Sequence, residues 1–174
     1  PPNILFLVGD DIGFGDLGIS GSVTRTPNLD ALAQQGTFFT NFHVSPVCSV
    51  TRSMMMTGND PIEIGLAAFD YTVYPPSEGK PGYEAHVTRN TAMISELLQD
   101  AGYRTYTVGK WHLGGSGHGG EGPHKWGFDR SYGLYTGAAN HWNQGAFHFN
   151  PEDPEIKAVL ARGEIPQEPY YENG

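Results

Sequence analysis

The chain has 174 residues, 38% of them hydrophobic and 17% charged, which suits a soluble globular domain with a sizeable core. Its net charge of -9 offers no basic surface for nucleic acid, and no apolar run is long enough to span a membrane. Cys48 is the only cysteine and cannot form an internal disulfide. The start at Pro-Pro-Asn, without methionine, indicates removal of a leader or other N-terminal segment and leaves a periplasmic, secreted or cytoplasmic location open.

The first predicted element is a strand over residues 3–9, whose continuous apolar run is typical of a strand buried on both faces of a parallel sheet. Asp10 and Asp11 follow it directly. Two adjacent carboxylates are costly to bury unpaired, and a divalent cation at the carboxyl end of a central strand would neutralise them. The residues alone leave a second interpretation open, in which the two acids simply cap the next turn.

Residues 26–36 predict a helix, with Thr26 as its N-cap, Pro27 in its first position and Gly36 at its end. Residues 37–43 alternate aromatic and polar side chains, which predicts a strand.

A short helix is predicted from Cys48 to about Gly58. Its N-terminus offers unpaired N–H groups and a partial positive charge, and Arg52, four residues on, lies on the same face as Cys48. A sulfur group beside a guanidinium at such a helix end is suited to chemistry on a tetrahedral oxyanion. The alternative, that Cys48 is a small buried hydrophobe as most free cysteines are, remains open on this segment alone.

Residues 59–89 are rich in proline and glycine and predict a long excursion that shapes access to a substrate. Residues 93–101 then place their apolar side chains on one helical face, and Gly102 ends that helix. Residues 103–108 predict a strand. The order strand, helix, strand predicts an α/β protein with a parallel sheet.

Lys110 and His112 follow this strand, and side chains two residues apart in an extended segment point to one side. Both can therefore reach the same anion. The alternative is a solvated lysine and a histidine packed by Trp111. The histidines lack partner cysteines or a His-Glu-x-x-His helix, so a zinc site is not expected, and His141 is interpreted as structural. Residues 126–129 predict a structural turn.

Three segments together resemble the site motifs of the type I sulfatases, in the order that this family has them: residues 9–16 (GDDIGFGD), 45–58 (SPVCSVTRSMMMTG) and 109–114 (GKWHLG). The resemblance extends from residue 3 to about residue 150. It implies an α/β fold like that of alkaline phosphatase, with a mixed, mostly parallel sheet flanked by helices. Residues 1–174 would be the N-terminal part of the catalytic domain.

The resemblance also implies a chemistry. In this family a maturation enzyme oxidises the motif cysteine, here Cys48, to Cα-formylglycine. The aldehyde hydrates to a gem-diol, one hydroxyl attacks the sulfur of a sulfate ester, and the second expels sulfate. Arg52 would support this nucleophile. The substrate would be a small-molecule or glycan sulfate ester.

The remaining site residues are implied in the same way. Asp10 and Asp11 would bind Ca²⁺ or Mg²⁺, which the Cys48-derived group would also touch. Lys110 would contact the sulfate, and His112 would hydrogen-bond the modified residue.

The segment departs from the family pattern at Val50, where the family has a proline that helps the maturation enzyme, and at Thr51, usually serine. The family's later acid–amide pair, histidine and second lysine have no counterpart here. We therefore expect a fragment that is aggregation-prone and inactive by itself, with residues 150–174 as a surface excursion or poorly packed tail. A phosphomonoester or phosphonate ester hydrolase, or an unconverted relic without activity, are the alternatives.

Overall fold

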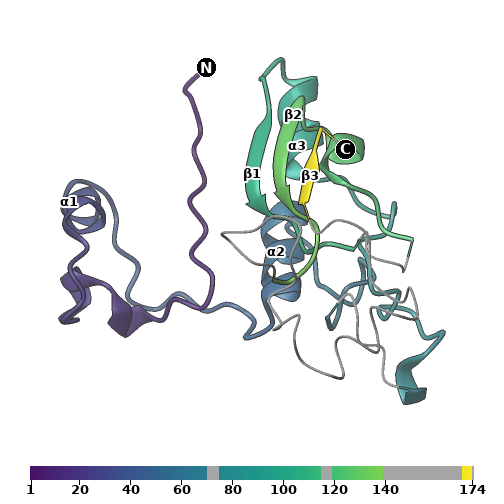
Figure 1. The fold of residues 1–174 in the computed structure, drawn as a ribbon, viewed down its shortest axis with the longest axis horizontal. Coiled ribbons are helices and arrows are strands. Elements are labelled where there is room, and N and C mark those ends of the chain that lie inside the picture. The colour runs from purple at the N-terminus through teal and green to yellow at the C-terminus, as the bar shows by residue number, and fades with distance from the viewer. Residues whose placement is uncertain (70–74, 115–118, 139–169, 174) are drawn as a thin grey trace, which may run out of the picture. The chain divides into compact units, whose positions relative to one another are not determined.

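The computed structural model describes residues 1–69, 75–114, 119–138 and 170–173. These residues form two compact units, residues 1–44 and 45–174 (Figure 1). The predicted structural role of His141 lies outside the described residues. Within the described residues, no helix is both long enough and apolar enough to cross a membrane.

The first unit is built on helix α1, Pro27–Gln35, which confirms the helix predicted there. Pro27 occupies its first turn, and the N–H of Gly36 closes it on the carbonyl of Leu32 at 2.9 Å. Thr26 is the N-cap residue, as predicted, although its side chain does not cap the helix. The Thr26 hydroxyl makes no cap hydrogen bond; it accepts the N–H of Gly18 at 2.8 Å instead. It thereby ties α1 to a short 3₁₀ turn, η2, at Gly18–Ser20. A second 3₁₀ turn, η1, spans Phe14–Asp16.

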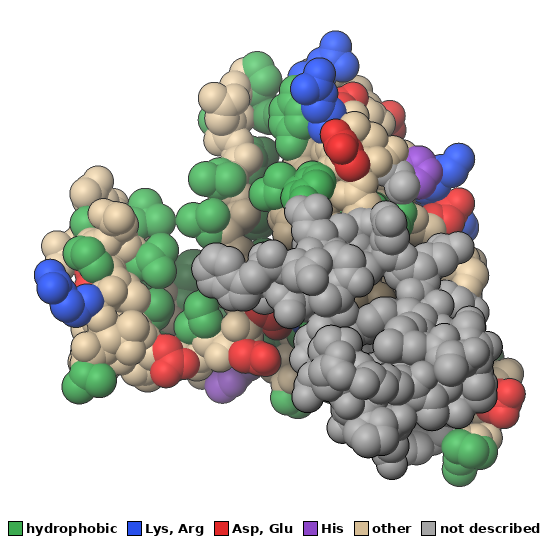
Figure 2. Space-filling model, viewed as in Figure 1, with side chains coloured by type: hydrophobic (Ala, Val, Ile, Leu, Met, Phe, Trp, Pro, Cys, Tyr) green, Lys and Arg blue, Asp and Glu red, His purple; other side chains and the backbone are tan. Residues whose placement is uncertain are grey.

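Two predicted strands are wrong for this unit, because residues 3–9 and 37–43 form no strand. The apolar side chains of residues 4–8 are exposed rather than buried, with Leu5 81% exposed (Figure 2). A strand requires backbone hydrogen bonds to a neighbour, whereas the apolar pattern reports only how well the side chains would suit a buried sheet. The sequence pattern therefore identifies a segment whose side chains suit a strand, but it does not show whether a neighbouring strand pairs with it.

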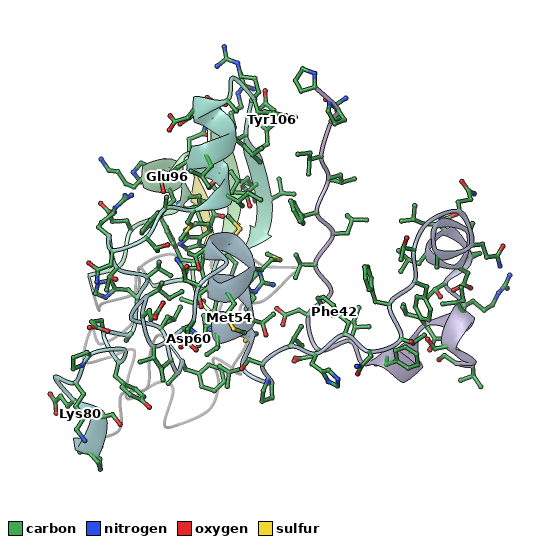
Figure 3. All side chains as sticks on the ribbon, turned by 180° about the vertical axis from the view of Figure 1, so that it is seen from behind. Phe42, Met54, Asp60, Lys80, Glu96 and Tyr106 are labelled. Carbon is green, nitrogen blue, oxygen red and sulfur yellow. The ribbon has the colours of Figure 1, made fainter. Side chains whose placement is uncertain are left out.

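The second unit contains a mixed sheet of three described strands in the order β1-β2-β3. Strand β1, Tyr106–Lys110, pairs in parallel with β2, Arg130–Leu134, and β2 pairs antiparallel with β3, Tyr170–Glu172. Two helices accompany the sheet: α2, Cys48–Thr57, and α3, Ile94–Asp100. Two further 3₁₀ turns are η3, Pro75–Ser77, and η4, Pro123–Trp126. The carboxyl ends of β1 and β2 point toward α2 (Figures 1 and 3), and α2 contacts α3.

The predicted helix over residues 93–101 is confirmed as α3, although its apolar face is only partly covered. Met93, just before the helix, is fully buried, whereas Leu97 is 60% exposed. The strand predicted over residues 103–108 exists but is displaced, because β1 runs from Tyr106 to Lys110. Thr105 lies outside it, since its N–H donates to the carboxylate of Asp129 at 2.9 Å.

The core of this unit lies between the sheet, its connections and the loop after α2. Its buried members come from segments far apart in the chain: Ile64, Leu66, Val87, Met93, Trp111, Leu113, Trp126 and Tyr171. The excursion over residues 59–89 therefore contributes three of these core side chains. Burial of such apolar area is the main source of folding free energy.

The C-terminal tail differs from its prediction where it is described. Residues 150–169 lie outside the described part, but β3 pairs with β2 and buries Tyr171, whose ring centroid lies 4.5 Å from that of Tyr135. Burial raises the pKa of Tyr171 far above its usual value, and the neighbouring Tyr135 acts in the same direction. This end of the chain is thus part of the core and not a loose surface segment.

The turn after η4 joins the sheet to α3, in agreement with its structural interpretation. Gly127 has a φ of +77°, and a Cβ at this position would lie 2.7 Å from the backbone of Glu96. The Ser95 hydroxyl donates to the carbonyl of Trp126 in the same junction. The N–H of Thr105 holds the Asp129 carboxylate, and this hydrogen bond lowers the pKa of Asp129.

This junction yields a paired prediction for the full-length protein. Gly102 also has a positive φ, +85°, but open space where a Cβ would lie. Gly102→Ala should therefore lower the free energy of unfolding by roughly 1–2 kcal/mol, because alanine is strained in left-handed backbone. Gly127→Ala adds a clash with the α3 backbone and should lower the free energy of unfolding by about 3 kcal/mol or more. Denaturant unfolding of the two variants measures the difference, and equal losses would contradict the close approach of Gly127 to α3.

Candidate active site

The candidate site is built on the start of α2, where the predicted helix is confirmed. Val47 is extended and precedes the helix, and its carbonyl accepts the first helical hydrogen bond, from the N–H of Thr51 at 3.0 Å. The Thr51 hydroxyl in turn donates to the carbonyl of Ser45 at 2.8 Å and holds the incoming loop. At the other end Gly58 adopts a φ of +70° and closes the helix on Met54. Cys48 is consequently the first residue of a helix with a defined start and end.

One face of α2 is anchored in the interior. Ser49, Val50 and Ser53 are buried, and the Ser49 hydroxyl donates to the carbonyl of Ala68 at 3.2 Å. Cys48 itself is a free thiol of intermediate exposure. The buried side chains hold the helix in place, while the partly exposed Cys48 remains accessible to groups from other elements.

Two side chains from the end of β1 converge on Cys48. The Lys110 ammonium donates to the Cys48 sulfur at 3.2 Å, and Nδ1 of His112 lies 3.3 Å from the same sulfur. These residues are 62 and 64 positions from Cys48 in the chain, so the fold assembles the group. Both side chains therefore reach the same point, the Cys48 sulfur, and Lys110 is partly buried there.

The backbone delivers His112 to this position in an unusual conformation. Lys110 is the last residue of β1, after which the N–H groups of Trp111 and His112 continue to donate, to Leu134 at 2.7 Å and to Tyr135 at 3.0 Å. His112 has a φ of +56° and is completely buried. Left-handed backbone is uncommon outside glycine, and it concentrates where surrounding structure holds a functional side chain in place.

Arg52 connects α2 to β1. Its Nη1 donates to the backbone carbonyl of Lys110 at 2.6 Å. It was expected to support the residue at position 48 from the same helical face. This hydrogen bond ties Arg52 to the strand that carries Lys110, and it helps to fix the distance between the two elements. The Arg52 charge also opposes part of the rise in the pKa of Tyr171.

Asp10 and Asp11 lie in the other unit and are exposed, with Asp11 in a left-handed conformation at a φ of +56°. Carboxylate oxygens are the donors that Ca²⁺ and Mg²⁺ prefer, so the chemistry of the pair fits such an ion. Their number does not complete a site, because the described residues contain no cluster of three or more His, Cys, Asp or Glu side chains that could hold a metal. The assignment of a metal to this pair remains a proposal.

Two contacts of His112 were not predicted. The ring of Phe69 lies 6.2 Å from the imidazole, tilted by 31°, and Gly137 approaches its other edge. Phe69 lies in a stretch without periodicity, so no sequence signal marked it. Gly137 belongs to a segment that was noted only for His141. Both depend on long-range packing that a local pattern does not contain.

Position 48 is thus surrounded by an ammonium group, an imidazole and the N–H groups of the first turn of α2, with a guanidinium securing the strand beside it. Preorganised donors of this kind stabilise negative charge that develops on oxygen in a transition state. The arrangement suits attack by a group at position 48 on an anionic tetrahedral centre.

Comparison with known proteins agrees with this arrangement. The family model described as Sulfatase matches residues 2–173. The chain is 42% identical over 161 residues to an uncharacterized sulfatase of Schizosaccharomyces pombe, covering 91% of this chain and 28% of that protein. It is 35% identical to the arylsulfatase of Klebsiella aerogenes, covering 82% and 30%, and 38% identical to the N-acetylgalactosamine-6-sulfatase of Rattus norvegicus, covering 90% and 28%. The chain therefore spans less than a third of the length of these relatives.

Solved structures give the same result. The crystal structure of Ps i-CgsB in complex with k-i-k-neocarrahexaose is 32% identical with a TM-score of 0.67, covering 95% of this chain and 34% of that one. The PsFucS1 sulfatase from Pseudoalteromonas sp. is 27% identical with a TM-score of 0.58, covering 88% and 28%. The predicted fold class, the N-terminal part of an alkaline phosphatase-like α/β domain, is confirmed. By family match, identity and fold, this chain belongs to the sulfatase family.

Proposed function

We propose that the protein containing this chain is a sulfuric ester hydrolase in which Cys48, converted to formylglycine, is the nucleophile. The observation that carries the proposal is the convergence of Lys110 Nζ and His112 Nδ1 on the Cys48 sulfur at the start of α2. The sulfur marks the position that an oxygen of the converted residue would occupy. Both side chains therefore lie within hydrogen-bond reach of the reacting group.

The roles follow from charge and position. The Lys110 ammonium donates hydrogen bonds and stabilises negative charge on the modified residue and on the oxygens of the bound sulfate. The His112 imidazole accepts or donates a proton at the same group, as general acid–base catalysis requires. Arg52 acts on the backbone carbonyl of Lys110 and keeps the strand at its distance from the helix.

A divalent ion is the second part of the proposal. Asp10 and Asp11 supply hard oxygen donors for Ca²⁺ or Mg²⁺, and further ligands would come from outside the residues that the structure describes. When bound, such an ion polarises a sulfate oxygen as a Lewis acid. A glycan sulfate ester is the substrate class that we favour, since one relative is an N-acetylgalactosamine-6-sulfatase and one similar structure holds a neocarrahexaose.

The first prediction concerns Cys48. Mass spectrometry of the protein made in its native host should show that the thiol at residue 48 has been replaced by an aldehyde or its hydrate. Val50→Pro should raise the converted fraction in a host that has the maturation enzyme. The amide of Val50 precedes the first helical hydrogen bond, donated by Thr51, so a proline there removes no helical bond. An intact thiol in all material would contradict the proposal.

The second prediction concerns Lys110. In the full-length protein, Lys110→Ala should lower kcat/KM for an aryl sulfate by roughly 10²–10³, the usual cost of one oxyanion-stabilising donor. Lys80→Ala is the matched control, because Lys80 lies in an exposed loop beside η3 (Figure 3). Turnover of the matched phosphate ester in place of the sulfate would instead identify a phosphomonoester hydrolase.

The third prediction concerns the metal. In the full-length protein, Asp10→Asn or Asp11→Asn should weaken binding of Ca²⁺ by more than tenfold in calorimetry, since each removes a charged oxygen ligand. Asp100→Asn, at the exposed end of α3, should leave that affinity unchanged. Undiminished affinity in both site variants would remove these carboxylates from the metal site.

A further inference from the structure

The ring of His112 is enclosed on several sides. It is completely buried, its Nδ1 lies 3.3 Å from the Cys48 sulfur, and the ring of Phe69 lies 6.2 Å away. Gly137 meets the edge that carries the other nitrogen. A Cβ on Gly137 would lie 2.9 Å from both Cε1 and Nε2 of the imidazole, closer than real Cβ atoms approach other heavy atoms.

Space, and not backbone conformation, is what Gly137 provides. Its φ does not fall in the left-handed region, so an alanine could adopt the same backbone without strain. An added methyl group would nevertheless have to displace the imidazole or the segment that carries residue 137. In close-packed interiors such overlaps are relieved by movement of the softest neighbour.

The segment around Gly137 has little freedom to retreat. It follows directly from β2, where the carbonyls of Leu134 and Tyr135 accept the N–H groups of Trp111 and His112 at 2.7 and 3.0 Å. One residue before it, the Thr136 hydroxyl donates to the carbonyl of Ala138 at 3.1 Å. The same backbone bonds thus hold the segment against the strand end that carries the imidazole. The ring would therefore take up the displacement, against Phe69 and position 48.

We propose that Gly137 is a positioning residue for the reaction: its missing side chain lets the His112 imidazole sit with Nδ1 directed at position 48. The effect of Gly137 on catalysis rests on the proposed function, whereas its effect on the position of the His112 ring does not. Misplacement of a reacting group by about 1 Å can cost on the order of 10² in rate.

The experiment compares two single-atom additions in the full-length protein. Gly137→Ala should lower kcat for an aryl sulfate at least about tenfold with KM changed less than about twofold, because the ring acts on the chemical step. Ala138→Ser adds one heavy atom at the exposed neighbouring position and should leave kcat unchanged. A crystal structure of Gly137→Ala in the unconverted Cys48 form should show the imidazole displaced.

A double-mutant cycle shows whether the effect passes through the ring. With His112→Ala the clash is absent, so adding Gly137→Ala should change neither the residual kcat nor the melting temperature further. The inference would be overturned if Gly137→Ala lowered kcat equally in the wild-type and His112→Ala backgrounds, or if Ala138→Ser lowered kcat as much as Gly137→Ala. An unmoved imidazole in the Gly137→Ala structure would also overturn it. Should the wild-type protein hydrolyse no sulfate ester, the proposed function fails, while the ring position and the melting temperatures still decide the role of Gly137.

Discussion

The second unit depends on one junction, where the end of β1 meets the start of α2. The hydrogen bond from Arg52 to the Lys110 carbonyl joins the two elements through backbone and side chain, and it sets the spacing at which Lys110 and His112 reach Cys48. Neither element alone makes a site. The helix start without the strand lacks Lys110 and His112, and the strand end without the helix lacks Cys48.

Sequence reasoning succeeded where the signal is local. Helices α1, α2 and α3 were predicted because Pro27, Gly36, Gly58 and Gly102 mark their ends and because apolar spacing marks their faces. These inferences need only the conformational preferences of a few consecutive residues. Lys110 and His112 do meet, but not through the extended backbone that their spacing assumed, because His112 lies beyond β1 with a φ of +56°.

Sequence reasoning failed where a structure depends on contacts with residues distant in the chain. Residues 3–9 and 37–43 have the composition of strands but form none, because pairing depends on backbone groups elsewhere. Tyr171 was placed in a tail because prolines and acids dominate its neighbourhood, yet it is buried on β3. The left-handed backbone of His112 and the approach of Gly137 were invisible for the same reason: both result from packing over long distances in the chain.

The pairing of β3 with β2 has a consequence for how the chain folds during synthesis. Among the described strands, β3 cannot pair with the second edge of β2, and Tyr171 cannot pack on Tyr135, until residues 170–172 have been synthesised. An open strand edge and uncovered aromatic surface favour association between chains. Synthesis of β3 therefore removes one edge of the described sheet to which a second chain could otherwise add.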